Sequence, residues 1–220
     1  MPYPMIHLET AYRLSDQYDW IEKKGDFLLG SVAPDAVHFH ERYDVHQKEI
    51  SHLWDCGPIW GVTLEREKWL NNIRTFWKQH KKEMNREFIA GYCIHLFTDW
   101  MNDQRMWAPF REKIIAGADY NEIYANSKYR EEAYGFDQWL YRTNAHTKII
   151  WEFLSEGQAY ELTGYIQVDD LARQKQSLLT EQYSGQKEYD IGQYEFYTKE
   201  AIDSFIAECV GMIAAEISLV

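Results

Sequence analysis

Apolar residues recur at helical spacing along most of the chain, and no run of alternating apolar and polar residues predicts a β-strand. The pattern predicts helices at residues 5–23, 26–30, 63–82, 85–101, 102–116, 120–142, 147–156, 168–179 and 193–218. Residues 41–61, which are rich in His, Asp, Trp and Gly, instead predict a long functional loop with some helix in it. These segments support one fold class, an all-α bundle of many helices.

Several of the predicted helix ends carry residues that suit them. Pro34 prevents simple continuation of the short helix before it, and Asp35 is a suitable N-cap for a helix that begins at the next residue. Thr63 and Asn85 suit the N-caps of the two long helices that follow. An N-cap role would explain Asp35 without any function.

The most apolar predicted helix contains two polar residues on one face. Residues 88–101 (FIAGYCIHLFTDWM) are apolar except for His95, Asp99 and Thr98, so this helix is expected to run through the middle of the bundle. His95 and Asp99 are one helical turn apart and leave the same face. A buried carboxylate without a partner costs several kcal/mol. The pair therefore predicts either two ligands of a zinc or iron ion or a buried His–Asp hydrogen bond.

Length and composition predict one folded domain. The chain has 220 residues and no Pro/Gly/Ser-rich linker, so we expect a single domain over residues 1–220. Hydrophobic residues make up 45% of the chain and aromatic residues 16%, which excludes a disordered protein.

Charge and cysteine content restrict the partners and the compartment. The formal net charge of −12 opposes binding to DNA, RNA or an anionic membrane, so no nucleic-acid partner is expected. No segment is long enough to span a bilayer, and the N-terminus lacks the basic start and apolar stretch of a signal peptide. Three scattered cysteines without a C-x-x-C spacing favour a reduced, cytoplasmic protein.

Histidines gather in the first quarter of the chain. Five of the eight lie before residue 53, interleaved with aspartates. His7 lies among apolar residues of the first helix, and His52 lies in the sequence SHLWD. Each of these taken singly is typical of an ordinary core or surface residue, and only their combination indicates a shared site.

Four pieces of sequence occur in a familiar order: His7 in IHLETA, Asp35 in FLLGSVAPD, His52 in SHL, and the His95–Asp99 pair in GYCIHLFTDW. In this combination the chain resembles the zinc-dependent phospholipase C family, whose best-known members are secreted bacterial phospholipases C. The resemblance implies a phospholipase C/P1 nuclease-like helical fold. It also implies that these five residues are metal ligands.

The chain departs from this family in two places. Secreted members build a third metal position partly from the amino terminus of the mature chain, and because the N-terminal residues do not resemble a signal peptide, we do not expect that ligand here. The family's remaining zinc ion uses further histidines and a glutamate, but MNDQRMWAPF, directly after the central helix, has no histidine. Asp137, Glu152 and His146 are the candidates for those ligands. One or two ions are therefore expected rather than three.

The resemblance also implies a division of roles. Asp99 would bridge two ions, with His52 and His95 completing one site and His7 the other. Asp35 would bind an ion or act as a general base on the attacking water. Partners that orient the imidazoles are expected around them, and the sequence offers two candidates, His38 and Tyr92.

The implied reaction is hydrolysis of a phosphodiester by a metal-activated water, with zinc as the cofactor and iron or another divalent metal as alternatives. A phospholipid, a soluble phosphodiester and a phosphomonoester all stay open as substrates. The tryptophans near the proposed ligands suit either a substrate pocket for an apolar or quaternary-ammonium group or an ordinary core; they are Trp54, Trp60, Trp100 and Trp107.

Three other classes of protein also have helical folds. An HD-type phosphohydrolase needs an adjacent His-Asp dipeptide, which the sequence lacks. A ferritin-like di-iron protein needs convincing Glu-x-x-His motifs on two helices, and these are absent too. A helical binding protein that holds metal without turnover is the non-enzymatic alternative, and it predicts metal content without hydrolysis.

Overall fold

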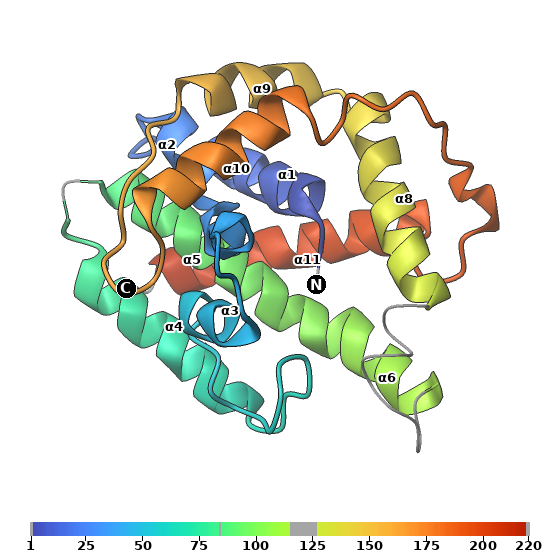
Figure 1. Ribbon diagram of the computed structural model, residues 1–220, viewed down its shortest axis with the longest axis horizontal. Coiled ribbons are helices and arrows are strands. Elements are labelled where there is room, and N and C mark those ends of the chain that lie inside the picture. Colours follow the sequence, from blue (N-terminus) through green and yellow to red (C-terminus); the bar gives the residue numbers. More distant parts are fainter. Residues whose placement is uncertain (1, 84, 115–126, 219–220) are drawn as a thin grey trace.

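The computed structural model describes residues 2–83, 85–114 and 127–218, and it is all-helical across these ranges apart from one isolated β-bridge between Leu162 and Ile166 (Figure 1). The elements are α1 (Pro4–Ser15), α2 (Lys24–Gly30), the 3-10 helix η1 (Ala33–Phe39), α3 (Val45–Ser51), α4 (Arg66–His80), α5 (Arg86–Asn102), the π-helix η2 (Asp103–Trp107), α6 (Ala108–Ile114), α8 (Lys128–Thr143), α9 (Thr147–Glu156), α10 (Val168–Thr180), the 3-10 helix η3 (Ile191–Gln193) and α11 (Lys199–Ser218). The predicted all-α class is confirmed.

Helix α5 is the central element of the bundle. It packs against α1, α2, α4 and α11, and it crosses the middle of the molecule in Figure 1, with α9 and α10 on one side and α4 on the other. Nearly every α5 side chain is buried, including those of His95 and Asp99. The sequence prediction of a buried central helix is confirmed, so the two polar residues lie in the core.

Two glycines bring α2 into direct backbone contact with α5. A Cβ at Gly30 would lie 2.2 Å from the carbonyl oxygen of Phe88, and a Cβ at Gly91 would lie 2.0 Å from that of Phe27. Any larger side chain would push the two helices apart. This close approach places Ser31, which directly follows α2, beside the middle of α5.

The predicted first helix is too long. It was expected to reach residue 23, but α1 ends at Ser15, whose hydroxyl donates to the carbonyl of Tyr12. After Leu14 the next fully buried apolar residue is Ile21, so no apolar stripe at helical spacing continues the helix and the chain turns.

Three predicted N-caps were wrong in detail. Thr63 lies three residues before α4, and its hydroxyl accepts from Trp54 Nε1 at 3.1 Å and donates to Asp103 Oδ1 at 3.2 Å. Asn85 occupies the N-cap position of α5, but its side chain caps no backbone N–H. Asp35 lies inside η1, so its carboxylate is free for other contacts. For Thr63 and Asp35, tertiary contacts replaced the local capping expected from sequence.

The remaining helices agree with the pattern except at their ends. The segment predicted at 102–116 divides into η2 and α6, and the part of the 120–142 prediction that precedes residue 127 lies outside the described residues, as do residues 115 and 116. Helix α8 begins at Lys128 with Ser127 as its N-cap. Residues 193–198 precede α11 instead of belonging to it. The expected loop at 41–61 contains α3 followed by an irregular stretch.

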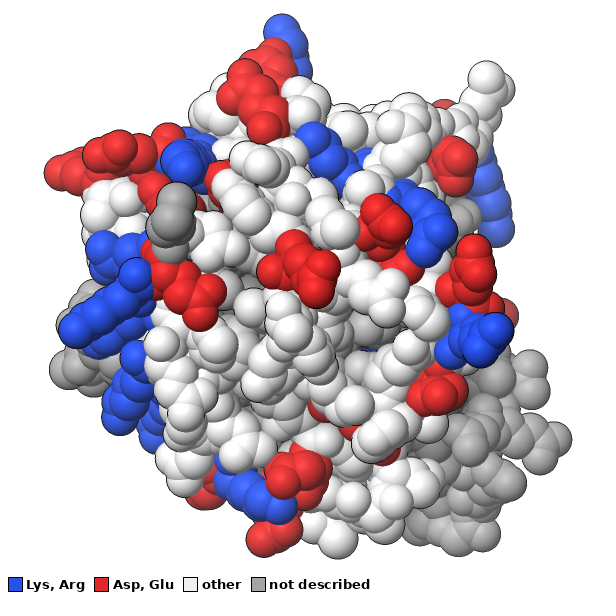
Figure 2. All heavy atoms as spheres, turned by 60° about the vertical axis from the view of Figure 1, so that its left-hand side comes forward, with Lys and Arg blue, Asp and Glu red and all other residues white. Residues whose placement is uncertain are grey.

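The described surface carries interspersed charges of both signs. On the face shown in Figure 2, blue and red side chains are interspersed among uncharged ones, and no extended basic patch is present there. None of the described helices combines the length and apolar character that a membrane span requires.

Candidate metal centre

The five residues predicted as metal ligands lie together at one place in the core. His7 Nε2 is 3.5 Å from Asp99 Oδ1, and the Nε2 atoms of His52 and His95 are each 3.4 Å from Asp99 Oδ2. Asp35 approaches the same group, with Oδ1 3.5 Å from His52 Nε2 and Oδ2 3.9 Å from His95 Nε2. Four separate elements, α1, η1, the end of α3 and α5, therefore deliver their side chains to one cluster.

The two imidazoles nearest the centre are oriented by backbone carbonyls. His95 Nδ1 lies 2.9 Å from the carbonyl oxygen of Ser31, and His52 Nδ1 lies 2.9 Å from that of Lys48. His52 is held further because its own carbonyl accepts from Trp69 Nε1 at 2.8 Å, and because Leu53, with φ of 54°, turns the chain away from α3. The sequence had not shown these carbonyls, since a backbone acceptor carries no residue-type signal.

These carbonyl contacts fix where the ring hydrogens lie. A carbonyl oxygen only accepts, so Nδ1 of both His52 and His95 carries a hydrogen. In the neutral rings each Nε2 is then a lone-pair acceptor, yet the two Nε2 atoms lie only 3.2 Å apart. Two facing lone pairs and two nearby carboxylates need a shared cation, which is either a proton or a metal ion.

Buried polar atoms in the cluster lack hydrogen-bond partners. Both carboxylate oxygens of Asp99 and both ring nitrogens of His7 make no hydrogen bond although they are inaccessible to solvent. The His7 ring stacks on that of His95, with centroids 3.9 Å apart and planes 8° from parallel. A buried polar group without a partner costs on the order of 1–3 kcal/mol, and a charged one costs more. Imidazole and carboxylate groups are suitable ligands for zinc or iron. A bound ion of either kind would give these unpaired atoms a partner.

Within the described part of the chain, the candidate ligands form two overlapping groups. One is His7, His95 and Asp99, and the other is Asp35, His52 and His95. In each group every residue offers one nitrogen or oxygen atom, and these atoms lie within 4.8 Å of one another. His95 belongs to both groups but has only Nε2 available, so it can bind one ion at a time. Asp99 presents Oδ1 to His7 and Oδ2 to His52 and His95, which is the arrangement of a bridging carboxylate.

The electrostatics of the cluster favour cation binding. Burial lowers the pKa of His7 to about 3 and that of His52 to about 4, so both imidazoles are neutral near pH 7 and have a lone pair to offer. Burial also acts to lower the pKa of His95, but Asp99 and Asp35 outweigh it and raise that pKa above its ordinary value. The same negative field that holds a proton on His95 would hold a metal ion in its place.

Lys48 is a member of the cluster that the sequence reasoning missed. Its Nζ donates to Asp35 Oδ1 at 2.8 Å and to His38 Nε2 at 2.9 Å. Burial acts to raise the pKa of Asp35, but Lys48, followed by His38 and His52, holds it well below the ordinary value. One sequence signal was available: Lys48 precedes His52 by four residues, the spacing that places two side chains on one helix face.

The other predicted residues lie elsewhere or play other parts. His38 contacts Lys48 rather than an imidazole, and the Tyr92 hydroxyl donates to the carbonyl of Ser51. His146 lies away from the cluster, at the N-cap of α9. Its Nδ1 is 3.0 Å from Oε1 of Glu9 on α1. Glu152 lies near Lys148 on α9, in an i,i+4 pair. The structure therefore brings none of these residues to the centre as a ligand.

Asp137, another predicted ligand, is buried beside α1. Its Oδ1 accepts from the Met5 N–H at 2.8 Å and its Oδ2 accepts from the Tyr183 hydroxyl at 2.8 Å. Both oxygens are thus committed to the fold. Burial raises the pKa of this carboxyl to about 7, although both hydrogen bonds oppose the shift.

This raised pKa predicts that stability falls with increasing pH. The folded protein binds the proton of Asp137 more tightly than the unfolded chain, so the contribution is complete below the unfolded value of 3.8 and is lost as the pH rises through about 7. The loss is on the order of 4 kcal/mol. Asp137→Asn should remove this dependence in urea unfolding of chelator-treated protein from about pH 4 to about pH 8. Exposed Asp19→Asn is the matched control, and an unchanged slope in Asp137→Asn would contradict the prediction.

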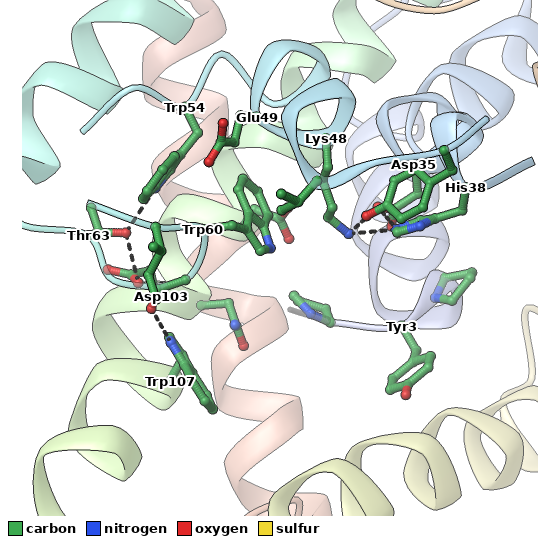
Figure 3. A pocket seen from close by; sticks show the side chains of 18 of the residues that line it. Tyr3, Asp35, His38, Lys48, Glu49, Trp54, Trp60, Thr63, Asp103 and Trp107 are labelled. Carbon is green, nitrogen blue, oxygen red and sulfur yellow. Dashed lines mark hydrogen bonds and ion pairs between the residues drawn. The ribbon is translucent and has the colours of Figure 1, made fainter. Parts of the chain in front are cut away.

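The cluster opens onto a cavity of about 800 Å³. Asp35 and Asp99 lie on its wall, and Trp54, Trp60 and Trp107 line it on the side of the loop that follows α3 (Figure 3). Trp100 is not among the lining residues of this cavity, and its Nε1 donates to the carbonyl of Arg66. The carboxylates therefore meet a space large enough for a small organic molecule, with largely aromatic and apolar walls.

Comparison of the chain with protein-family models, curated proteins and solved structures found no match. The function must therefore be inferred from the cluster and its cavity.

Proposed function

We propose that the protein is a metal-dependent phosphoric ester hydrolase of the phospholipase C type. One observation supports this most strongly. Side chains of three histidines and two aspartates converge beside a cavity whose wall includes Asp35 and Asp99, and four buried polar atoms of this group, in His7 and Asp99, have no hydrogen-bond partner. The order of the four sequence pieces that carry these residues, which resembles that of the phospholipase C family, supports the same reaction class.

Each residue has a proposed part in this function. Asp99 would hold two ions as a bridge, with His52 and His95 on one of its oxygens and His7 on the other. A divalent ion such as zinc, when bound here, supplies Lewis acidity toward a phosphoryl oxygen and toward water. Ser31 and Lys48 orient the imidazoles through their carbonyls, which keeps each Nε2 aimed at the centre.

Asp35 is better suited to bind a cation than to take a proton. Its carboxylate is paired with Lys48 at 2.8 Å, and its pKa lies well below the ordinary value. A carboxylate with so low a pKa is a weak base near pH 7. Of the two roles that the resemblance implied, we therefore favour that of a ligand or positioning group.

The walls of the cavity suggest an ester with an apolar substituent. Trp54, Trp60 and Trp107 line the interior, and two exposed apolar side chains, Val45 and Ile59, lie at its rim. Such walls favour an aromatic or aliphatic group attached to the phosphate. We propose a phosphodiester of this kind as the substrate class.

Metal content and turnover on bis-para-nitrophenyl phosphate test the proposal. Zinc-loaded wild type should hold close to stoichiometric metal and hydrolyse the diester, and Asp99→Ala should lower the rate by about a thousandfold through loss of the ion. The hydrolysis rate of Asp35→Asn should lie between those of wild type and Asp99→Ala. His146→Gln, which alters a histidine outside the cluster, is the matched control and should retain full activity.

Two outcomes would contradict the proposal. Equal rates in wild type, Asp99→Ala and Asp35→Asn would show that the turnover is background. Stoichiometric metal without hydrolysis of diesters or monoesters would instead indicate a metal-binding protein that is not an enzyme.

A further inference from the structure

Lys48 is a buried cation on the wall of the cavity. Only 8% of the residue is accessible to solvent, yet it lines the cavity together with Asp35 and His38 (Figure 3). Its Nζ lies 5.4 Å from the centre of the Trp60 ring, on the side of the ring that faces Asp35 and His38. The ammonium group is therefore held at a fixed place beside the candidate ligand Asp35.

The contacts of Lys48 leave part of its hydrogen-bonding capacity unused. An ammonium group has three hydrogens. Among the described residues, two partners accept from it, Asp35 Oδ1 at 2.8 Å and His38 Nε2 at 2.9 Å. One hydrogen remains for an acceptor in the cavity. Asp35 offsets the cost of burying this ammonium group and holds it in place, so the third hydrogen can serve a ligand in the cavity.

The charge balance indicates the kind of acceptor. Of the charged residues that line the cavity, Asp35, Glu49, Asp99 and Asp103 are negative and Lys48 and Arg130 are positive, so binding of two divalent ions leaves the lining with a net positive charge. A bound anion would then be attracted in an otherwise acidic protein. An ammonium group binds phosphate oxygens well as a compact point charge.

Building on the proposed function, we propose that Lys48 is the phosphate-binding residue of this site. Its ammonium group, fixed by Asp35 and His38, would donate to a non-bridging oxygen of the substrate phosphate beside the metal ion. A tethered cation at this position supplies charge that a further metal ion would otherwise have to supply. It also makes the site selective for phosphoryl groups over neutral esters.

A purely structural role makes a different prediction. If Lys48 served only to neutralise Asp35 and to join α3 to η1, its loss would lower stability or metal content and would not act on anion binding specifically. Inorganic phosphate is therefore the informative probe, because it tests the anion contact without requiring turnover.

The experiment measures phosphate binding by isothermal titration calorimetry with zinc-loaded protein. Lys48→Met should weaken phosphate binding at least about tenfold while zinc content is retained, as expected for loss of one charged hydrogen bond. Lys48→Arg, which keeps the charge, should retain part of the affinity. Lys68→Met is the matched control, since Lys68 forms an exposed pair with Asp55 at 2.9 Å, and it should bind phosphate like wild type.

A measurement on unsubstituted protein covers the case in which Lys48→Met does not fold. With lysine labelled with carbon-13 at the ε position, the Lys48 resonance of the zinc-loaded wild type should shift on phosphate addition, with the affinity found by calorimetry. The Lys68 resonance should stay in place.

The outcomes separate this inference from the proposed function. Equal phosphate affinity in wild type and Lys48→Met, loss of zinc in Lys48→Met, or no phosphate binding by wild type at millimolar concentration would each overturn the inference. If Lys48→Met alone loses phosphate binding but wild type hydrolyses no ester, the inference stands and the enzymatic proposal fails. If diester hydrolysis is normal in Lys48→Met and absent in Asp99→Ala, the enzymatic proposal stands and the inference about Lys48 fails.

Discussion

Asp99→Asn is expected to abolish metal binding without reducing the stability of the metal-free protein. Asp99 is completely buried, and neither of its oxygens accepts a hydrogen bond. The amide has almost the same volume but no charge, so it removes the burial cost of the carboxylate and leaves no cavity. His95 can then release its proton, because its pKa is raised chiefly by the Asp99 charge against the effect of burial.

Thermal unfolding with and without zinc measures this effect. Wild type should gain about 4 kcal/mol of stability when free zinc is at about a thousand times its Kd, or roughly 10 °C in Tm for a chain of this size. Asp99→Asn should show no zinc-dependent rise and a Tm in chelator at least equal to that of wild type. His146→Gln should respond to zinc as wild type does.

The opposite pattern would favour the structural interpretation of the same residue pair. If Asp99 were retained for a buried hydrogen bond with His95, Asp99→Asn would be destabilised by about 1–3 kcal/mol in chelator, and zinc would have no effect on either protein. The two interpretations that the sequence left open are therefore separated by the Tm in chelator and the response to zinc.

The sequence was sufficient to place the polar pair of the central helix. His95 and Asp99 lie on a helix with almost no other polar residue, so periodicity alone predicted both their burial and their common face. His7, Asp35 and His52 were less visible, because each is unremarkable in its own segment. Only their order along the chain suggested that they belong together, and the structure does bring them together.

Other features of the site depend on tertiary contacts that local sequence does not report. The Ser31 carbonyl reaches His95 because Gly30 and Gly91 allow α2 to lie directly on α5. Asp137 is of a residue type that binds metals, but its carboxylate accepts a hydrogen bond from the backbone N–H of Met5. Lys48 was missed because a lysine in a predicted loop is normally exposed, and its burial follows from η1 lying beside α3.

Removal of the metal is expected to have the largest effect of all on activity. Chelation of wild-type protein should lower hydrolysis of bis-para-nitrophenyl phosphate by about a thousandfold or more, because several kcal/mol of transition-state stabilisation comes from the ion. Addition of zinc should restore the rate. Restoration is expected because burial lowers the pKa of His7 to about 3 and of His52 to about 4, so neither imidazole has to lose a proton before the ion returns near pH 7.

Thiol groups are the main competing zinc ligands, and the structure argues against them. Cys56, Cys93 and Cys209 are buried and free, and burial raises the pKa of each, to about 12 for Cys56. A thiol must lose its proton to bind zinc, which these environments oppose. Cys56→Ser should therefore hold as much zinc as wild type and recover fully after chelation. Loss of zinc in Cys56→Ser together with normal zinc content in Asp99→Ala would move the metal site away from the histidine cluster.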